Sequence, residues 1–245
     1  MKASPPPTVL VTGGAVRIGR SICRAFASAG YRVVVHYNAS SDAARACCRE
    51  LENLGTKAWR VRANLASETG CRKLINRAFE LAGTIHVLVN NAAVFNACPL
   101  SAVDAAALRR EFAVNLFAPI LLTRFFAERC SRGCVVNLLD RRIAAMDPAR
   151  IPYVLTKKGL AEFTRSAALA LAPRIRVNAV APGPVLPPPG QGEDYLRARA
   201  GKIPTAAPIS PDEVGRAVLY LAESPSITGQ VLFVDGGQHL LGEGV

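Results

Sequence analysis

The stretch Thr8-Val-Leu-Val-Thr-Gly-Gly-Ala-Val-Arg-Ile-Gly19 decides the fold of this chain. Its first part is a short apolar run that predicts a buried strand, and its second part is a glycine-rich turn. An amphipathic segment from Arg17 to Ala29 follows and predicts a helix, with Gly30 as its C-terminal stop. The order strand, turn, helix is typical of the first unit of a nucleotide-binding α/β sheet.

The glycines of this turn have separate physical uses. Gly13 and Gly14 permit a tight turn, and Gly19 permits the helix to pack closely on the strand. Backbone N–H groups at the start of the helix can then face a pyrophosphate. The alternative is an ordinary strand-to-helix connection.

Further apolar runs alternate with helical segments along the chain. Strands alternating with helices predict a parallel sheet with right-handed crossovers and helices on both faces. The predicted fold is therefore α/β, a doubly wound parallel sheet of Rossmann type, in a single domain that spans residues 1–245. The predicted strands are Thr8–Thr12, Arg32–His36, Lys57–Arg62, Ile85–Asn90, Cys134–Leu139, Arg174–Val180 and Gln230–Val234.

One segment interrupts this pattern. Prolines are dense from Pro182 to Pro189, and Gly190 and Gly192 follow them. This composition predicts a loop, and the loop begins directly after a strand, at the carboxyl edge where such sheets bind ligands. We expect residues 183–203 to form a substrate loop.

No acidic residue follows the second predicted strand until Asp42. An enzyme selective for NAD usually has an acid there, which holds the ribose 2′-hydroxyl. A 2′-phosphate would instead meet Ser40, Ser41 and the start of the next helix, with Arg17 able to reach across from the glycine turn. The sequence therefore predicts NADPH as the cofactor. Ser40 also fits a helix cap, and one serine can fill both roles.

Tyr153 and Lys157 stand one helical turn apart, on one face of the helix predicted from Tyr153 to Ala172. A free tyrosine has a pKa of about 10, too high for efficient proton transfer at neutral pH. A lysine ammonium about 4 Å away would stabilise the phenolate by roughly 4 kcal/mol at an effective dielectric near 20, which brings that pKa toward neutrality. The pair predicts a proton donor. The alternative is a packed tyrosine beside a solvated lysine.

Pro119 predicts a free carbonyl inside a helix, because proline has no N–H to donate to the carbonyl of Asn115 four residues earlier. That carbonyl could hold a water against Lys157. A plain kink is the alternative.

These motifs together resemble the short-chain dehydrogenase/reductase family over nearly the whole chain, and in detail its pteridine reductase branch. The resemblance rests on the Thr12–Gly19 turn, on Val89-Asn-Asn-Ala-Ala93 and on Tyr153 with Lys157, which occur in the family's order. It gives Asn115 the water-holding role. It also implies a homotetramer, and a helix rich in alanine and leucine on more than one face, as the one from Tyr153 is, suits a subunit interface.

The resemblance further implies a set of cofactor-binding residues. Asn64-Leu65 stands where the family commonly has Asp-Leu beside the adenine ring, and Ala39 stands where pteridine reductases often carry an arginine. The expected NADPH-binding residues are Gly13, Arg17, Ile18, Gly19, His36, Tyr37, Asn38, Ser40, Ser41, Asn64, Leu65, Asn91, Ala92, Tyr153, Lys157, Pro182 and Gly183.

Asp140 departs from most of the family, which has a serine there to polarise a substrate carbonyl. A carboxyl group accepts hydrogen bonds and, when protonated, donates one. Aspartate at this position resembles the pteridine reductases, as does Phe95, where those enzymes stack an aromatic ring against the pterin. Phe95 could equally be a core residue, and Arg141 or Arg142 could hold Asp140 in an ion pair.

The sequence thus predicts an NADPH-dependent reductase of a dihydropterin-like heterocycle. The alternatives are a ketoacyl-carrier-protein reductase, which Asp140 argues against, and a non-catalytic NADPH-binding or scaffold protein, which the intact site residues argue against. The expected catalytic residues are Asn115, Asp140, Tyr153 and Lys157, and the expected substrate-binding residues are Arg17, Phe95, Asp140 and Tyr153.

The composition of the chain argues against several kinds of partner and site. The net charge of +12 is dispersed, without a basic run interleaved with aromatics, which argues against nucleic acid as a partner. Seven scattered cysteines and three histidines predict reduced thiols and no metal site. No apolar stretch reaches the roughly 18 residues of a membrane span, and the first residues lack the apolar core of a signal peptide, so we expect a cytoplasmic protein without membrane contact.

Overall fold

The computed structural model describes residues 5–187, 190, 192, 194 and 203–241. Within them the chain forms a seven-stranded sheet of order β3-β2-β1-β4-β5-β6-β7, in which all neighbouring strands are parallel. This confirms the predicted doubly wound α/β fold. The strands are β1 (Thr8–Val11), β2 (Arg32–Tyr37), β3 (Ala58–Arg62), β4 (Val87–Asn90), β5 (Gly133–Leu138), β6 (Ile175–Pro182) and β7 (Val231–Val234).

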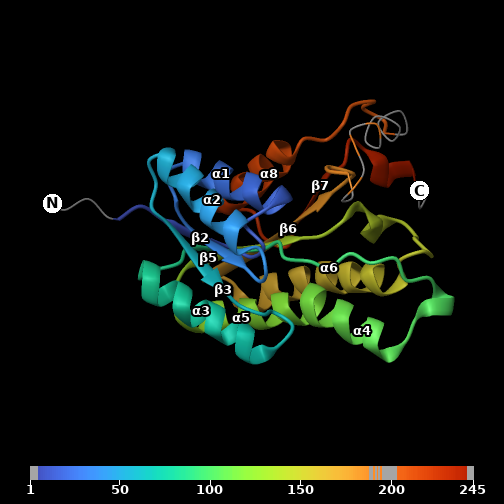
Figure 1. The fold of residues 1–245 in the computed structure, drawn as a ribbon, viewed down its shortest axis with the longest axis horizontal. Helices are drawn as coiled ribbons and strands as arrows, with labels where there is room; N and C mark the ends of the chain where they lie inside the picture. The colour runs from blue at the N-terminus through green and yellow to red at the C-terminus, as the bar shows by residue number, and fades with distance from the viewer. Residues whose placement is uncertain (1–4, 188–189, 191, 193, 195–202, 242–245) are drawn as a thin grey trace.

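Helices cover both faces of the sheet (Figure 1). One layer consists of α1 (Arg17–Ser28), α2 (Ser41–Asn53) and α8 (Pro211–Glu223), with α1 packed on α8. The other layer consists of α3 (Glu68–Ala82), α4 (Ala105–Phe112), α5 (Ala118–Arg129) and α6 (Ile151–Leu171). A π-helical turn, η2 (Ala113–Phe117), joins α4 to α5, and the 3-10 turns are η1 (Leu100–Ala102), η3 (Arg141–Ala144) and η4 (Gln238–Leu241).

The core divides into two main clusters because successive strand residues point to opposite faces of the sheet. In β1, Val9 and Val11 pack under α1 and α2, while Leu10 packs toward α3 and α5. All three are fully buried. This explains why β1 reads as a continuous apolar run rather than as an alternating one.

Helix ends agree closely with their sequence signals. Helix α1 ends at Ser28, and Gly30 follows with a φ of +82°, as predicted from its glycine. Helix α6 begins at Ile151, two residues before the predicted start, with Pro152 in its first turn. Proline suits this position because its missing N–H would have no partner there.

All seven cysteines are free and buried. Across the residues that the structure describes, no three metal-ligating side chains gather, and no helix is long and apolar enough to cross a membrane.

Candidate active site

The turn between β1 and α1 is tied to the segment that follows β4. The side-chain amide of Asn91 donates to the carbonyl oxygens of Thr12, at 2.8 Å, and Gly13, at 3.2 Å. The backbone N–H groups of Asn91 and Ala92 donate to the Thr12 hydroxyl at 2.9 and 3.0 Å. Gly13 has a φ of +61°, and a Cβ at Gly19 would overlap the Gly13 carbonyl, so both positions need glycine.

Helix α1 starts behind this turn without a side-chain cap, because Val16 occupies the cap position. The first N–H groups of a helix have no partner within the helix, so this end suits an anion. The guanidinium of Arg17 donates to the carbonyl oxygen of Pro187 at 3.0 Å. Arg17 thus joins the glycine turn to the first part of the predicted substrate loop.

Most of that loop lies outside the described residues, namely 188–189, 191, 193 and 195–202. Its beginning is anchored. Pro182 ends β6 as a buried residue, and Gly183 donates from its N–H to the carbonyl of Val234 at 3.0 Å. A Cβ at Gly183 would lie 2.7 Å from Ile209, which explains the glycine there.

His36 is hydrogen-bonded to the glycine turn. Its ring Nδ1 accepts from the N–H of Gly13 at 3.0 Å, so Nε2 carries the proton and donates to the carbonyl of Ala63 at 3.1 Å. Burial lowers the pKa of His36 to about 4. The ring is therefore neutral, and both of its nitrogens are hydrogen-bonded within the protein. It reaches the predicted cofactor site only through its hydrogen bond with Gly13.

The end of β2 is open and polar. Asn38, Ala39 and Ser40 are exposed, and Tyr37 and Ser41 are partly buried. Ser40 holds the cap position of α2, but its side chain makes no capping hydrogen bond. The simple cap interpretation of Ser40 is therefore wrong in this structure, and its hydroxyl faces out at the start of a helix.

Of the other predicted cofactor residues, Ile18 is partly buried in the first turn of α1. Beyond β3, Leu65 is buried in the core, while Asn64 is exposed and its side-chain oxygen accepts from the N–H of Ala66 at 3.0 Å. β3 neighbours β2, so Asn64 stands at the same edge of the sheet as Ser40.

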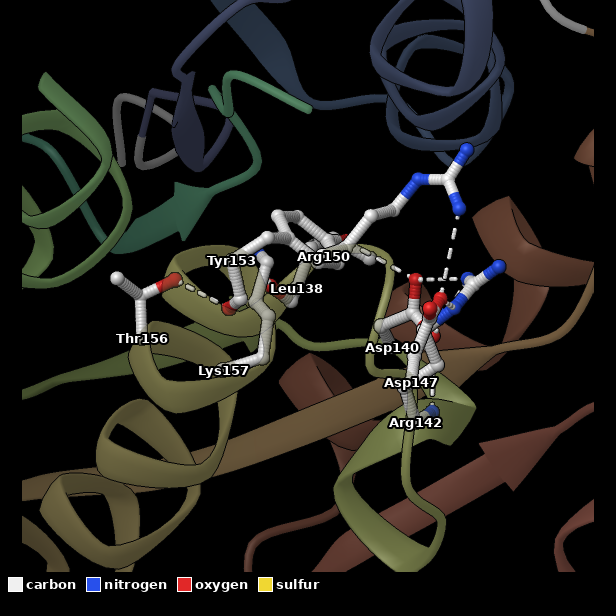
Figure 2. Close-up of polar contacts among 8 residues, drawn as sticks. All are labelled: Leu138, Asp140, Arg142, Asp147, Arg150, Tyr153, Thr156 and Lys157. Carbon is white, nitrogen blue, oxygen red and sulfur yellow. Dashed lines mark hydrogen bonds and ion pairs between the residues drawn. The ribbon is translucent and has the colours of Figure 1, made fainter. Parts of the chain in front are cut away.

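Tyr153 and Lys157 lie on one face of α6, and both are buried (Figure 2). The Tyr153 hydroxyl donates to Oδ2 of Asp140 at 3.0 Å, and the Lys157 ammonium donates to the carbonyl oxygen of Leu138 at 2.7 Å. The ammonium lies 5.8 Å from the centre of the tyrosine ring. The alternative of a solvated lysine is therefore wrong.

The pKa of Tyr153 moves opposite to the prediction. Burial and the Asp140 carboxylate raise the pKa of Tyr153 well above its usual value of 10.0, and Arg142 opposes them. The prediction of a lowered pKa is wrong here because the phenol is buried and its hydrogen-bond partner is an acid rather than the lysine. Tyr153 is consequently held as a protonated phenol across the neutral range.

Burial has the opposite effect on the pKa of Lys157. Burial lowers the pKa of Lys157 from 10.5 to about 8, while Asp140 and Glu111 act to raise it. With a pKa of about 8, the ammonium form still prevails at neutral pH.

Asp140 belongs to a chain of ion pairs, as Figure 2 shows. Its carboxylate accepts from the backbone N–H of Arg142 at 2.8 Å and from the guanidinium at 3.1 Å. Arg142 also donates to Asp147 at 2.8 Å, and Arg150 lies 3.5 Å from the same Asp147. The possible ion pair thus exists with Arg142, and it fixes Asp140 without taking Asp140 away from Tyr153.

Phe95 forms an aromatic wall beside Tyr153. Their rings meet edge to face, 4.7 Å apart, and the guanidinium groups of Arg150 and Arg142 lie 4.7 and 5.3 Å from the Phe95 ring centre. Phe95 is 46% exposed, so the alternative of a core phenylalanine is wrong. Nearly half of the Phe95 side chain is thus open to solvent, beside two guanidinium groups.

Asn115 lies in the π-helical turn η2 and is fully buried. Its side chain clamps the backbone of Val94, accepting from the N–H at 2.8 Å and donating to the carbonyl at 2.9 Å. Pro119, four residues after Asn115, therefore accompanies a π-type bulge. Such bulges are often found at functional sites. That the Asn115 carbonyl holds a water stays a prediction.

Sequence reasoning missed Glu111, Asn96 and Arg150. Glu111 is 1% exposed and accepts hydrogen bonds from Asn96, at 2.7 Å, and Asn115, at 2.8 Å. The only sequence signal for it was its place four residues before Asn115, one helical turn away. Arg150 carried no sequence signal, because its contact with Phe95 depends on the pairing of two distant segments at Cys98 and Arg150.

Comparison with known proteins agrees with this geometry. A family model described as "Enoyl-(Acyl carrier protein) reductase" matches residues 14–239. The structure of FolM alternative dihydrofolate reductase 1 from Brucella canis, complexed with NADP, is 40% identical, with a TM-score of 0.91 over 96% of this chain and 95% of that one. The Brucella suis protein of the same name, also with NADP, is 40% identical, with a TM-score of 0.88 over the same shares.

A relative with a different described activity is also similar. The granaticin polyketide synthase putative ketoacyl reductase 2 of Streptomyces violaceoruber is 35% identical over 96% of this chain and 97% of its own length. The family model, these relatives and the assembled Tyr153 and Lys157 lead to one conclusion: the chain belongs to the short-chain dehydrogenase/reductase family.

Proposed function

We propose that this protein is an NADPH-dependent reductase of a dihydropterin-like heterocycle. The observation that carries the proposal is the hydrogen bond from the Tyr153 hydroxyl to Asp140, beneath the exposed ring of Phe95. A carboxylate at this place opposes a developing alkoxide but suits a heterocycle with N–H donors and basic nitrogens. The FolM proteins of Brucella, named dihydrofolate reductases, support the choice of a pterin-type ring.

The residues present fit NADPH. The glycine turn, on which α1 packs closely at Gly19, and the uncapped start of α1 suit a pyrophosphate. Ser40, Ser41 and Arg17 would hold the 2′-phosphate. Asp42, the first acid after β2, has a 95% exposed side chain and lies 3.8 Å from Arg45. The NADP complexes of the Brucella proteins support the same cofactor. Bound there, NADPH would supply a hydride.

Reduction of a C=N bond needs one hydride at carbon and one proton at nitrogen. Tyr153 holds that proton, because its raised pKa keeps the phenol protonated. Giving it up would leave a phenolate beside the Asp140 carboxylate, so the transfer requires compensation. Arg142 lowers the free-energy cost of the Tyr153 phenolate. A proton that returns through Asp140, or from the Lys157 ammonium, then restores the phenol. Asp140 also accepts from the N–H edge of the heterocycle and orients it.

Phe95 and Arg17 complete the proposed substrate site. The aromatic face of Phe95 stacks on the planar ring, and Arg17 lies at the junction of the glycine turn and the predicted substrate loop. The proposed roles of Asn115 and Lys157 are to hold a water and to supply protons from the interior side.

A ketoacyl reductase is the second candidate, because the Streptomyces relative is similar over nearly its full length. The two candidates differ in substrate, so a turnover screen decides between them. NADPH oxidation is measured with dihydropterins, dihydrofolate and 3-ketoacyl thioesters. We expect turnover of the heterocycles; turnover of the thioesters alone would select the second candidate, and none at all the non-catalytic alternative.

The proposed assembly is a homotetramer in the cytoplasm. Leu155 and Leu169 of α6 are 49% and 84% exposed, and Phe117 of η2, a turn that packs against α6, is 52% exposed. Such apolar surface suits burial against another subunit. Light scattering should give the mass of four chains, and the mass of one chain would contradict it.

A further inference from the structure

Phe95 stands in a segment with little backbone support. Residues 91–97 belong to no helix or strand, and the Phe95 side chain is 46% exposed, so core packing alone does not fix its ring. In the described part of the chain, no backbone–backbone hydrogen bond joins residues 93–97 to another residue. The next one runs from the N–H of Cys98 to the carbonyl of Ala149 at 2.8 Å. The edge-to-face contact of Phe95 with Tyr153 therefore needs another source of order.

Side-chain hydrogen bonds hold the residues on either side of Phe95. Before it, Asn115 accepts from the N–H of Val94 at 2.8 Å and donates to the carbonyl of Val94 at 2.9 Å. After it, the side-chain amide of Asn96 donates to Oε1 of Glu111 at 2.7 Å. Both neighbours of Phe95 are thus tied to the continuous helical segment formed by α4 and η2.

The two ties meet at one buried carboxylate. Glu111 is 1% exposed, and its second oxygen, Oε2, accepts from the side-chain amide of Asn115 at 2.8 Å. Burying a carboxylate is costly unless it is hydrogen-bonded, and here each oxygen has an amide donor. A carboxylate only accepts hydrogen bonds, so the nitrogen of Asn115 must face Glu111, which leaves its oxygen for the N–H of Val94. Glu111 therefore acts on both flanks of Phe95.

We propose that Glu111 and Asn96 are positioning residues, which fix the Phe95 ring beside Tyr153 before a substrate binds. A wall that is already in place loses less conformational freedom when a ligand binds, so it favours binding. The inference rests on the proposed function for its effect on the substrate. The position of the ring does not, since it can be measured without any substrate.

Three variants separate the hydrogen bonds from the fold. Asn96→Ala removes the direct tie at an exposed position, and it tests the proposal even if a core variant fails to fold. Glu111→Met removes the acceptor of both ties and keeps a side chain of similar length. Glu111→Gln keeps both, because its oxygen accepts from Asn115 and its NH₂ group donates to Asn96 once that exposed amide turns. The matched control is Asn76→Ala, at an exposed asparagine of α3 that is hydrogen-bonded to Arg129 at 3.3 Å.

The direct readout is the nuclear Overhauser effect between the Phe95 and Tyr153 rings, in protein labelled at phenylalanine and tyrosine. It is measured beside the melting temperature of each variant. The ring centres lie 4.7 Å apart, so the effect should be strong in the unmodified protein. We expect it to be lost in Asn96→Ala and Glu111→Met and kept in Glu111→Gln and Asn76→Ala. An undiminished effect in either of the first two variants when folded, or its loss in either of the last two, overturns the proposal.

Turnover provides the second readout. KM for the heterocycle should rise about fivefold in Asn96→Ala and Glu111→Met, because a well-placed aromatic contact is worth about that factor in binding. The kcat and the Kd of NADPH should change little, and Glu111→Gln should keep the KM of the unmodified protein. A fall in kcat and melting temperature at unchanged KM would show a merely structural role and contradict the proposal. If the unmodified protein turns over no heterocycle, the proposed function fails, and the nuclear Overhauser effect alone decides the role of the two residues.

Discussion

At the scale of single residues, the active site depends on which group is hydrogen-bonded to the Tyr153 hydroxyl. The spacing of Tyr153 and Lys157 correctly predicted two side chains on one helix face, but not the direction of the tyrosine pKa. That direction depends on Asp140, which comes from another element and lies 3.0 Å from the hydroxyl. No local pattern reports such a distance.

Tyr153→Phe should lower kcat for heterocycle reduction by about a hundredfold or more, because a positioned proton donor typically contributes that much. The phenyl ring keeps the edge-to-face contact with Phe95, so the Kd of NADPH should change little. Stopped-flow kinetics and fluorescence titration with NADPH measure the two effects. If the Phe variant retains most of the activity, the proton comes from another group, and Asp140 is the first to examine.

His36 should make the glycine turn sensitive to acid. Its pKa in the folded protein is about 4, below the ordinary value of 6.5, so its contribution to stability is complete above pH 6.5 and is lost as the pH falls toward 4. The full loss is about 3 kcal/mol, since one pKa unit corresponds to about 1.4 kcal/mol.

Urea unfolding at pH 7 and at pH 4.5 measures this term. His36→Gln keeps a side chain that can both accept from Gly13 and donate to Ala63, yet it cannot be protonated. The variant should lose less stability between the two pH values than the unmodified protein. Equal losses would show that other groups cause the acid sensitivity.

At the scale of elements, strands and helices could be predicted because their signals are local. The run Thr8–Thr12 and the stop at Gly30 each correspond to an observed boundary within one residue. The end of β2 is also a local feature, because the residues that would meet a 2′-phosphate follow one another in sequence. The contact of Phe95 with Tyr153 was beyond prediction, because it joins two segments that are distant in sequence, which also pair at Cys98 and Arg150.

Ala39→Asp should reverse or erase a preference for NADPH over NADH. Ala39 is exposed at the end of β2, beside Ser40, and a carboxylate there would repel a 2′-phosphate. The Kd of NADPH should rise by about tenfold or more, equivalent to roughly 1.4 kcal/mol, while that of NADH changes little. Ala39→Asn, of similar size and without charge, is the control. Equal Kd values for both cofactors in the unmodified protein would contradict the cofactor assignment.

At the scale of the whole molecule, the sheet brings the ends of β1, β4, β5 and β6 to one edge, and this is why motifs far apart in sequence form one site. The motif order was enough to predict that edge and its glycine turn. The partners of the charged groups in the site were harder to predict: Glu111 was missed, and Asp140, although expected in the site, was not expected as the hydrogen-bond acceptor of Tyr153. Their effect depends on burial, which a sequence does not give residue by residue.

The central claim is that Asp140 adapts this fold to a heterocycle rather than to a ketone. The most direct test compares kcat/KM for a dihydropterin and for a 3-ketoacyl thioester in the unmodified protein and in Asp140→Ser. Melting temperatures are measured in parallel because Arg142 would lose one of its two acidic partners. The account predicts that the variant loses heterocycle reduction by about a hundredfold or more and that its thioester reduction is unchanged or improved. Rapid thioester reduction by the unmodified protein, without reduction of dihydropterins, would contradict it.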